Sequence, residues 1–383
     1  MTSRTKLLLS AFLVTALGLL LPTAPAGAAE PLELEGRGFG HGIGLSQHGA
    51  QRAATQGVGW QRILRTYYPG TRLGRAGGQV AVWISGDDDG DTRVEDRPGL
   101  RLAKVGTARS WSLAKLDPRA EQWRVSADGR GRSVLESRRD GSWRRQQVFT
   151  GDAEFSAPAP ITLVTPEGRT AYRGVLRSAA ASADGTRRDT VNRLSLENYL
   201  RGVVPQEVPA LWDPDAVRAQ AVAARTYAAF ERADRAARHY QICDTSQCQV
   251  YGGASAEHEA SDAAIRATRG RAVTRGGDPI FAQFSASNGG YSVRGSFDYL
   301  PARRDSWDRY KWEQTVSVAD LETAFDTIGD YERVEVVERD GRGAWGGRVT
   351  RVTVVGSEGS STVSGDTFRI RLGLRSTLFH EVS

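Results

Sequence analysis

The feature that most constrains the fold is a predicted long helix with an unusually small-sided face. Asp213 and Pro214 provide an N-cap residue followed by proline at the first helical position, a combination that starts helices. At about 100° per residue, four apolar residues then fall on one narrow stripe. They are Val217, Ala221, Ala224 and Ala228. Because these side chains are small, a neighbouring element is expected to pack closely against the helix.

Polar residues flank this stripe on both margins. Gln220 and Tyr227 lie on one margin, and Arg225 lies on the other. Arg225 has two interpretations: a structural arginine whose charge is solvated or ion-paired, or an anchor for a carboxylate or a polar sugar substituent. Gln220 has the same two interpretations.

Strand signals surround the helix. Residues 78–175 alternate between apolar and polar side chains and contain repeated turn signals, and residues 347–381 again predict β-hairpins. Helices are also expected over residues 50–67, interrupted near Gly57, and over residues 256–269. The predicted fold class is therefore α+β, with a β-rich region added to a core that contains the long helix and β-hairpins.

The N-terminus has the pattern of a signal peptide. Arg4 and Lys6 precede an apolar run over residues 7–21, and small residues follow at 26–29. Residues 1–29 are therefore expected to be removed on export. No second apolar stretch is long enough to predict a membrane span in the mature chain.

The charge balance restricts the partners. Lys and Arg number 51 against 45 Asp and Glu, a formal net charge of +6. This mild excess suits an anionic surface such as a cell wall, and it does not predict nucleic-acid binding. A hydrophobic content of 39% with nine Trp excludes disorder over most of the chain.

Cys243 and Cys248 are the only two cysteines in the sequence. In an exported protein, two thiols five residues apart predict a disulfide that closes a small loop. A zinc site that also uses His239, and a pair of reduced thiols, remain alternatives.

Glycine recurs at every second position from 36 to 44. Such a segment predicts a loop whose backbone goes where side chains cannot. His41 lies in it and His48 follows shortly after, but no third ligand follows at a fixed spacing, so no metal site is predicted. The segment lacks the Gly-Lys-Ser/Thr ending of a phosphate-binding loop, and no cofactor is predicted.

Glu207 is the preferred catalytic candidate. It lies between Pro205 and Pro209, which predict a stiff loop, and beside apolar residues such as Val204 and Trp212. Partial desolvation raises the pKa of a carboxyl group, as a general acid requires near neutral pH. The alternative is an ordinary surface glutamate in a loop.

Taken together, four segments resemble the SpoIID/LytB family, the group of stage II sporulation protein D and amidase enhancers. They are LENYLRGVVPQEVP (196–209), AQAVAARTY (219–227), FSASNGG (284–290), and GFGHGIGLSQHGA (38–50) with YYPG (67–70) after it. The resemblance assigns residues 30–77 and 166–383 to a SpoIID-like core and leaves 78–165 as the β-rich region.

The resemblance implies a lytic transglycosylase of peptidoglycan with Glu207 and Arg225 at the catalytic positions. His41, Gln220, Ser285, Ser287 and Asn288 are then expected to line a saccharide cleft. Further candidates for substrate binding in the same motifs are Ser46, Gln47 and Tyr227. Some members are described as enhancers of a cell-wall amidase, which leaves a glycan-binding activator and a possible amidase partner as the main alternative. A purely structural wall protein is a third.

The sequence departs from the family pattern in three ways. Val208 replaces the usual Met, and His48 replaces a frequent Trp. The Gly-His-Gly segment begins the chain, whereas the commonest family order places it at the C-terminal end. This order predicts a circular permutation, in which residues 34–40 pair near residues 379–382.

Overall fold

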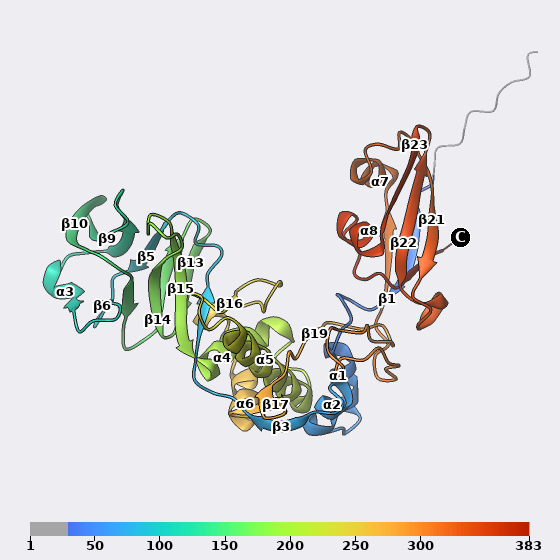
Figure 1. The fold of residues 1–383 in the computed structure, drawn as a ribbon, viewed down its shortest axis with the longest axis horizontal. Helices are drawn as coiled ribbons and strands as arrows, with labels where there is room; N and C mark the ends of the chain where they lie inside the picture. The colour runs from blue at the N-terminus through green and yellow to red at the C-terminus, as the bar shows by residue number, and fades with distance from the viewer. Residues whose placement is uncertain (1–29, 383) are drawn as a thin grey trace, which may run out of the picture.

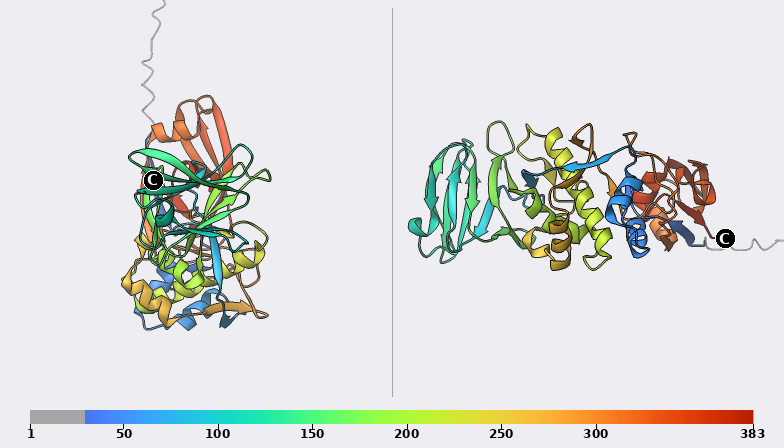
Figure 2. Two further views of the ribbon diagram at one scale, coloured as in Figure 1. Left: turned by 90° about the vertical axis from the view of Figure 1, so that its left-hand side faces the viewer. Right: turned by 90° about the horizontal axis from the view of Figure 1, so that it is seen from below.

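The computed structural model describes residues 30–382, which form an elongated α+β protein (Figures 1 and 2). Sheets make up one end, helices occupy the middle, and a lobe of strands and short helices forms the other end (Figure 1). The predicted fold class is confirmed. The predicted signal peptide, residues 1–29, lies outside the described residues. Between residues 30 and 382, no helix is long and apolar enough to cross a membrane.

The β-rich end consists of two sheets that share one apolar cluster, in which Trp123, Leu135 and Phe155 are fully buried. The seven-stranded sheet has the order β16 (Ile242–Cys243), β4 (Gln79–Trp83), β15 (Arg188–Ser195), β14 (Val175–Ala180), β11 (Ala153–Ser156), β6 (Arg101–Lys104) and β7 (Ser110–Ser112). The six-stranded sheet has the order β10 (Ser142–Phe149), β9 (Ser133–Arg139), β8 (Gln122–Ala127), β5 (Asp91–Glu95), β12 (Ile161–Thr165) and β13 (Gly168–Tyr172). A short helix, α3 (Leu113–Leu116), follows β7.

These sheets cross the domain boundary expected at residue 165. Residue 165 lies in the hairpin formed by β12 and β13. In addition, β4, which precedes this boundary in the sequence, pairs with β15, which follows it. The β-rich region therefore shares its sheets with the segment that follows, because strands distant in sequence complete the same hydrogen-bonded ladder.

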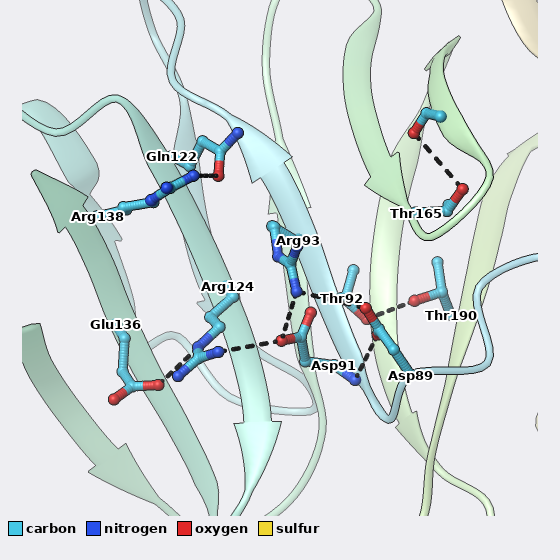
Figure 3. Close-up of polar contacts among 11 residues, drawn as sticks. Asp89, Asp91, Thr92, Arg93, Gln122, Arg124, Glu136, Arg138, Thr165 and Thr190 are labelled. Carbon is cyan, nitrogen blue, oxygen red and sulfur yellow. Dashed lines mark hydrogen bonds and ion pairs between the residues drawn. The ribbon is translucent and has the colours of Figure 1, made fainter. Parts of the chain in front are cut away.

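Arginines pair with two aspartates of the acidic turn that connects β4 to β5. Arg93 pairs with Asp89 at 3.3 Å and with Asp91 at 3.4 Å, and Arg124 joins Asp91 to Glu136 (Figure 3). In the part of the chain that the structure describes, no group of three or more His, Cys, Asp or Glu residues is arranged to hold a metal ion. The turn is thus an acidic segment tied to its own sheet.

The helical middle is built around α5 (Pro214–Asp234), whose N-cap Asp213 accepts a hydrogen bond from the backbone N–H of Asp215. The predicted small-residue stripe is buried in the cluster shared with the sheets, and the opposite side, including Ala219 and Ala223, is buried in a second cluster. The helices around α5 are α1 (Gln47–Thr55), α2 (Trp60–Tyr67), α4 (Leu196–Glu207), α6 (Glu259–Ala267) and the 3-10 helix η1 (Gly253–Ala256). Short strands complete this part: β2 (Leu45–Ser46) with β19 (Phe284–Ser285), and β3 (Arg72–Arg75) with β17 (Arg271–Arg275) and β18 (Asp278–Pro279).

Two helices begin at other residues than predicted, because of their N-cap side chains. α1 begins before residue 50 because the hydroxyl of Ser46 accepts the N–H of Gly49, and α1 and α2 are separated at Gly57, which has a φ of +79°. α6 begins later than residue 256 because the side chain of His258 caps it. The sequence located both helical segments but not these caps.

The C-terminal lobe has its own apolar cluster. One sheet has the order β20 (Lys311–Val316), β1 (Leu32–Arg37) and β24 (Phe379–Glu381), and the other has β21 (Tyr331–Arg339), β22 (Val349–Gly356) and β23 (Gly359–Ser364). Its helices are α7 (Val318–Ala324), α8 (Gly365–Arg371) and the 3-10 helix η2 (Ala344–Gly346).

Strands from the two ends of the described chain lie side by side in this lobe. β1 pairs with β24 in antiparallel register, with Leu34 opposite Glu381 and Gly36 opposite Phe379. Of the expected pairing between residues 34–40 and residues 379–382, the structure shows the part from 34–36 to 379–381, which places the two ends of the described chain together as a circular permutation requires.

Candidate functional site

Glu207 ends α4 instead of lying in a loop between two prolines. The expectation of a rigid loop is wrong because the helix continues through Pro205 to its last turn, where a proline removes a single backbone donor. One carboxylate oxygen accepts the backbone N–H of Val250 at 3.0 Å, and the other accepts Nε2 of Gln47 at 3.4 Å. Burial raises the pKa of Glu207, more than these two hydrogen bonds lower it.

The backbone donor at Val250 is held by a short disulfide loop. Cys243 and Cys248 are bonded, so the disulfide prediction is confirmed and the zinc and reduced-thiol alternatives are wrong. Val250 lies just after this loop, and the N–H of its neighbour Tyr251 donates back to the carbonyl of Asp244 inside the loop. The covalent bond thus fixes the segment that hydrogen-bonds to Glu207.

Loss of this disulfide should destabilise the protein and loosen the site. For the variant Cys243→Ser/Cys248→Ser, we expect the free energy of unfolding to fall by about 2 kcal/mol, because a short closed loop no longer restricts the unfolded chain. Urea denaturation of the variant and of the oxidised wild type measures this difference. An unchanged denaturation midpoint would show that the loop is held by its other contacts alone.

A cavity of about 480 Å³ opens beside the carboxyl group of Glu207. Besides Glu207, its lining comes from residues 39–41, Gln47, Tyr227, residues 246–248, Val250, Phe281 and residues 283–286. Tyr227 stacks on Phe281 with ring centroids 5.1 Å apart, so one wall is aromatic. Its volume lies within the range typical of small-ligand sites.

The glycine-rich segment forms another wall of this cavity. Gly40 and Gly42 have φ values of +85° and +73°, which other residues rarely adopt, and they hold His41 between them. The Nδ1 atom of His41 accepts the N–H of Ile43 at 3.0 Å. His41 is exposed to solvent on one side. The protein that surrounds the rest of its ring and the cation of Arg348 nevertheless lower its pKa, which favours the neutral imidazole.

The position of Gln47 depends on two buried aspartates that the sequence analysis missed. Ser46 and Ser287 both donate to Asp308, at 2.6 Å and 2.7 Å, while Asn288 donates to Asp305 at 2.8 Å. Since Ser46 is the N-cap of α1, this network fixes the first turn of the helix that carries Gln47. The Asp-x-x-Asp spacing at 305–308 was the available signal, but its partners lie far away in sequence.

Similarity to known proteins agrees with the motifs around this cavity. The family described as "SpoIID: Stage II sporulation protein" matches residues 184–274. The chain is 37% identical over 131 residues to the amidase enhancer of Bacillus subtilis (strain 168), a match covering 32% of this chain and 18% of that protein. It is 28% identical over 224 residues to stage II sporulation protein D of the same organism, covering 51% of this chain and 62% of that protein.

The resemblance to the SpoIID/LytB family is confirmed. The matches span less than two thirds of the length of these two relatives. The family match includes α4 and α5, whereas the glycine-rich segment and residues 284–290 lie outside it. In the structure these separate SpoIID-like motifs meet at one cavity.

Arg225 of the SpoIID-like helix α5 points away from the cavity. Its side chain is fully buried and forms a bidentate ion pair with Glu197, with both N···O distances 2.9 Å. It also donates to the carbonyl of Arg271. These contacts match the interpretation of Arg225 as an ion-paired structural arginine. Arg225 does not line the cavity, where the family resemblance places it.

The remaining predicted contacts divide between the cavity and the core. His41, Gln47, Tyr227 and Ser285 line the cavity. Ser285 is buried there, and its hydroxyl has no hydrogen-bond partner among the described residues. The other candidates, placed in the interior instead, are Ser46, Gln220, Ser287 and Asn288. Ser46, Ser287 and Asn288 belong to the buried network of Asp305 and Asp308, whereas the buried side-chain amide of Gln220 has no hydrogen-bond partner among the described residues. Sequence spacing does not distinguish a cavity wall from such interior positions.

An aromatic row borders the cavity and was also missed. Phe39 stacks on Tyr310 at 6.3 Å between ring centroids, Tyr310 contacts His48 at 4.6 Å, and His48 contacts Trp212 at 5.2 Å. Phe39 is 44% exposed and also lines the cavity. Phe39 is the member of the row that lines the cavity, so its exposed ring is the one on which a sugar could stack.

Proposed function

We propose that this protein is an exported lytic transglycosylase that cleaves the bond between N-acetylmuramic acid and N-acetylglucosamine in peptidoglycan. The names of the relatives, amidase enhancer and stage II sporulation protein D, support a role at the cell wall. The observation that carries the proposal is chemical. Among the described residues that line the cavity, Glu207 is the only carboxyl group, and its pKa is raised by burial.

A single carboxyl group suffices for this reaction. Protonated Glu207 donates to the glycosidic oxygen while an oxocarbenium-like state develops at C1 of the muramic ring. The Glu207 carboxylate then takes the proton from the C6 hydroxyl of the same sugar, and that oxygen attacks C1 to close an anhydro ring. No water is activated on the opposite face, so the second carboxyl group of a hydrolytic glycosidase is not required.

Neighbouring groups support these steps. The N–H of Val250 and the amide of Gln47 orient the carboxyl group and stabilise its charged form after proton transfer. The unpartnered hydroxyl of Ser285 and the neutral ring of His41 provide polar contacts for the sugar. The aromatic wall at Tyr227 excludes water from one side.

The pH dependence of the rate follows from the raised pKa of Glu207. The acid form is required, so kcat/KM should fall as pH rises through the folded-state pKa, which lies above the ordinary value of 4.5. Gln47→Leu removes a hydrogen bond to the charged form, which raises the pKa further and moves the descending limb to higher pH. Initial rates across a pH series test both statements, and a limb at or below pH 4.5 would contradict them.

The alternative is a glycan-binding enhancer of a cell-wall amidase, which the name of one relative favours. Incubation of the purified protein alone with peptide-free glycan strands separates the two. A transglycosylase shortens the strands without any amidase. An enhancer leaves their length unchanged and accelerates an added amidase on intact peptidoglycan.

A further inference from the structure

A second cavity adjoins the first at the glycine-rich segment. Its volume is about 490 Å³, and Gly40 and His41 line both cavities. Most of the other walls of the second cavity come from the C-terminal lobe, including Arg348, Asp366 and Thr377, and Val293 and Arg294 complete them. A glycan bound at Glu207 that passes His41 would enter this second space.

Arg348 is a buried cation in this cavity without an ion-pair partner. The residue is only 6% exposed, and burial lowers its pKa to about 10. Its guanidinium group donates to two neutral acceptors, the carbonyl of Asn288 at 3.0 Å and the hydroxyl of Thr377 at 3.4 Å. Within the described part of the chain, no carboxylate lies within ion-pair distance of it. Burying a charge in this way is costly, so an anionic ligand would relieve the cost.

The acidic residues on the walls of the second cavity are already used elsewhere. Asp340 accepts the backbone N–H groups of Arg342 and Arg348, at 3.0 Å and 2.9 Å. Asp366 pairs with Arg369 at 3.3 Å. Both carboxylates act on Arg348 only at longer range. Among the described residues, the guanidinium group of Arg348 therefore has no competing anion in contact with it.

The glycine-rich segment is shaped around this cation. A Cβ atom at Gly42 would collide with the guanidinium group of Arg348. Gly42 also adopts a positive φ, so any larger residue there would strain the loop and displace the arginine. The same short segment thus presents His41 to the first cavity and packs on the cation of the second.

We propose that Arg348 binds a carboxylate of the glycan strand in the sugar subsite next to the one at Glu207. The identity of the glycan rests on the proposed function. The sugar rings themselves are uncharged, but each muramoyl residue carries a lactyl carboxylate or, where that group is amidated, a stem peptide with its own carboxylates. The planar guanidinium group matches either carboxylate with two parallel hydrogen bonds. Arg348 would then distinguish muramic-acid glycans from uncharged polymers of N-acetylglucosamine.

Binding measurements on the Glu207→Gln protein test this without requiring cleavage. The probes are a peptide-free tetrasaccharide with alternating N-acetylglucosamine and N-acetylmuramic acid, the same tetrasaccharide with amidated lactyl groups, and a strand that retains stem peptides. Calorimetry should show that amidation weakens binding by about 10-fold to 100-fold, the range of a charge-assisted hydrogen-bonded pair. Adding Arg348→Met should bring the ratio of the two affinities to about one.

The matched control is Arg351→Met, which removes an exposed arginine on β22, the strand that begins directly after Arg348. Arg351→Met should keep the full ratio of the two tetrasaccharide affinities. Because partial unfolding would weaken both affinities equally, it would leave this ratio unchanged and would not imitate the effect. Arg348-dependent binding of only the strand with stem peptides would place the carboxylate on the peptide. Two results would overturn the assignment. The first is equal affinity for the tetrasaccharide and its amidated form, together with stem-peptide binding that does not depend on Arg348. The second is an Arg348→Met variant that still binds the tetrasaccharide more tightly than its amidated form. Cleavage by the wild type alongside such a result would leave the proposed function intact.

Discussion

Replacement of Glu207 by glutamine is expected to lower the rate of glycan cleavage about a thousandfold. The amide keeps the shape of the side chain but cannot donate the proton that the leaving oxygen needs, and general acid–base catalysis typically contributes about 10²–10⁴. The hydrogen bonds from Val250 and Gln47 position the carboxyl group that carries this proton at the cavity wall. Initial rates on peptide-free strands, followed by release of soluble oligosaccharides, measure the effect.

The loss should occur without unfolding. A carboxyl group whose pKa is raised in the folded state destabilises the protein once pH exceeds the unfolded-state pKa, and this cost is complete above the folded-state pKa. Glu207→Gln removes that cost, so its melting temperature at neutral pH should equal or exceed that of the wild type. Glu231→Gln is the matched control, because burial also raises the pKa of Glu231 but it does not line the cavity. Wild-type rates for both variants would exclude Glu207 as the acid.

Replacement of Glu197 by leucine should produce the largest loss of stability. Arg225 is completely buried, and Glu197 provides the only carboxylate paired with it among the described residues. Removing one partner of a buried pair leaves an uncompensated charge, which costs about 3–5 kcal/mol. Chemical denaturation monitored by tryptophan fluorescence measures this loss.

A double variant separates this structural role from catalysis. Arg225→Met/Glu197→Leu removes both charges, so it should recover most of the stability lost in Glu197→Leu alone. If Arg225 only positions α4 and α5, the double variant should also retain cleavage activity at temperatures where it is folded. A folded double variant with no activity would instead favour the direct catalytic role that the family resemblance implies.

The sequence predicted what depends on local pattern and spacing. The Asp213 cap, the small-residue face of α5 and the disulfide each follow from residues close together in the chain, and all three are observed. The motifs at Glu207 and at the glycine-rich segment also proved to meet at one cavity. A family resemblance gathers such motifs even when they are 160 residues apart, as Gln47 and Glu207 are.

What the sequence did not predict depends on partners that only folding brings together. Arg225 has the residue type of an anion anchor, and nothing in its own helix reveals that Glu197 of α4 neutralises it. Ser287 and Asn288 resemble sugar contacts, yet Asp308 and Asp305 bind them in the interior. Arg348 gave no signal at all, because an isolated arginine before a strand is ordinarily solvated.

The chemical identity of the new chain ends is the most direct test of the central claim. Peptide-free glycan strands would be incubated with the wild-type protein in heavy-oxygen water and then analysed by mass spectrometry. If the lone carboxyl group of Glu207 directs attack by the sugar's own C6 hydroxyl, the products end in anhydro-muramic acid and contain no heavy oxygen. Reducing ends labelled with heavy oxygen, or strands that remain uncut, would contradict the account.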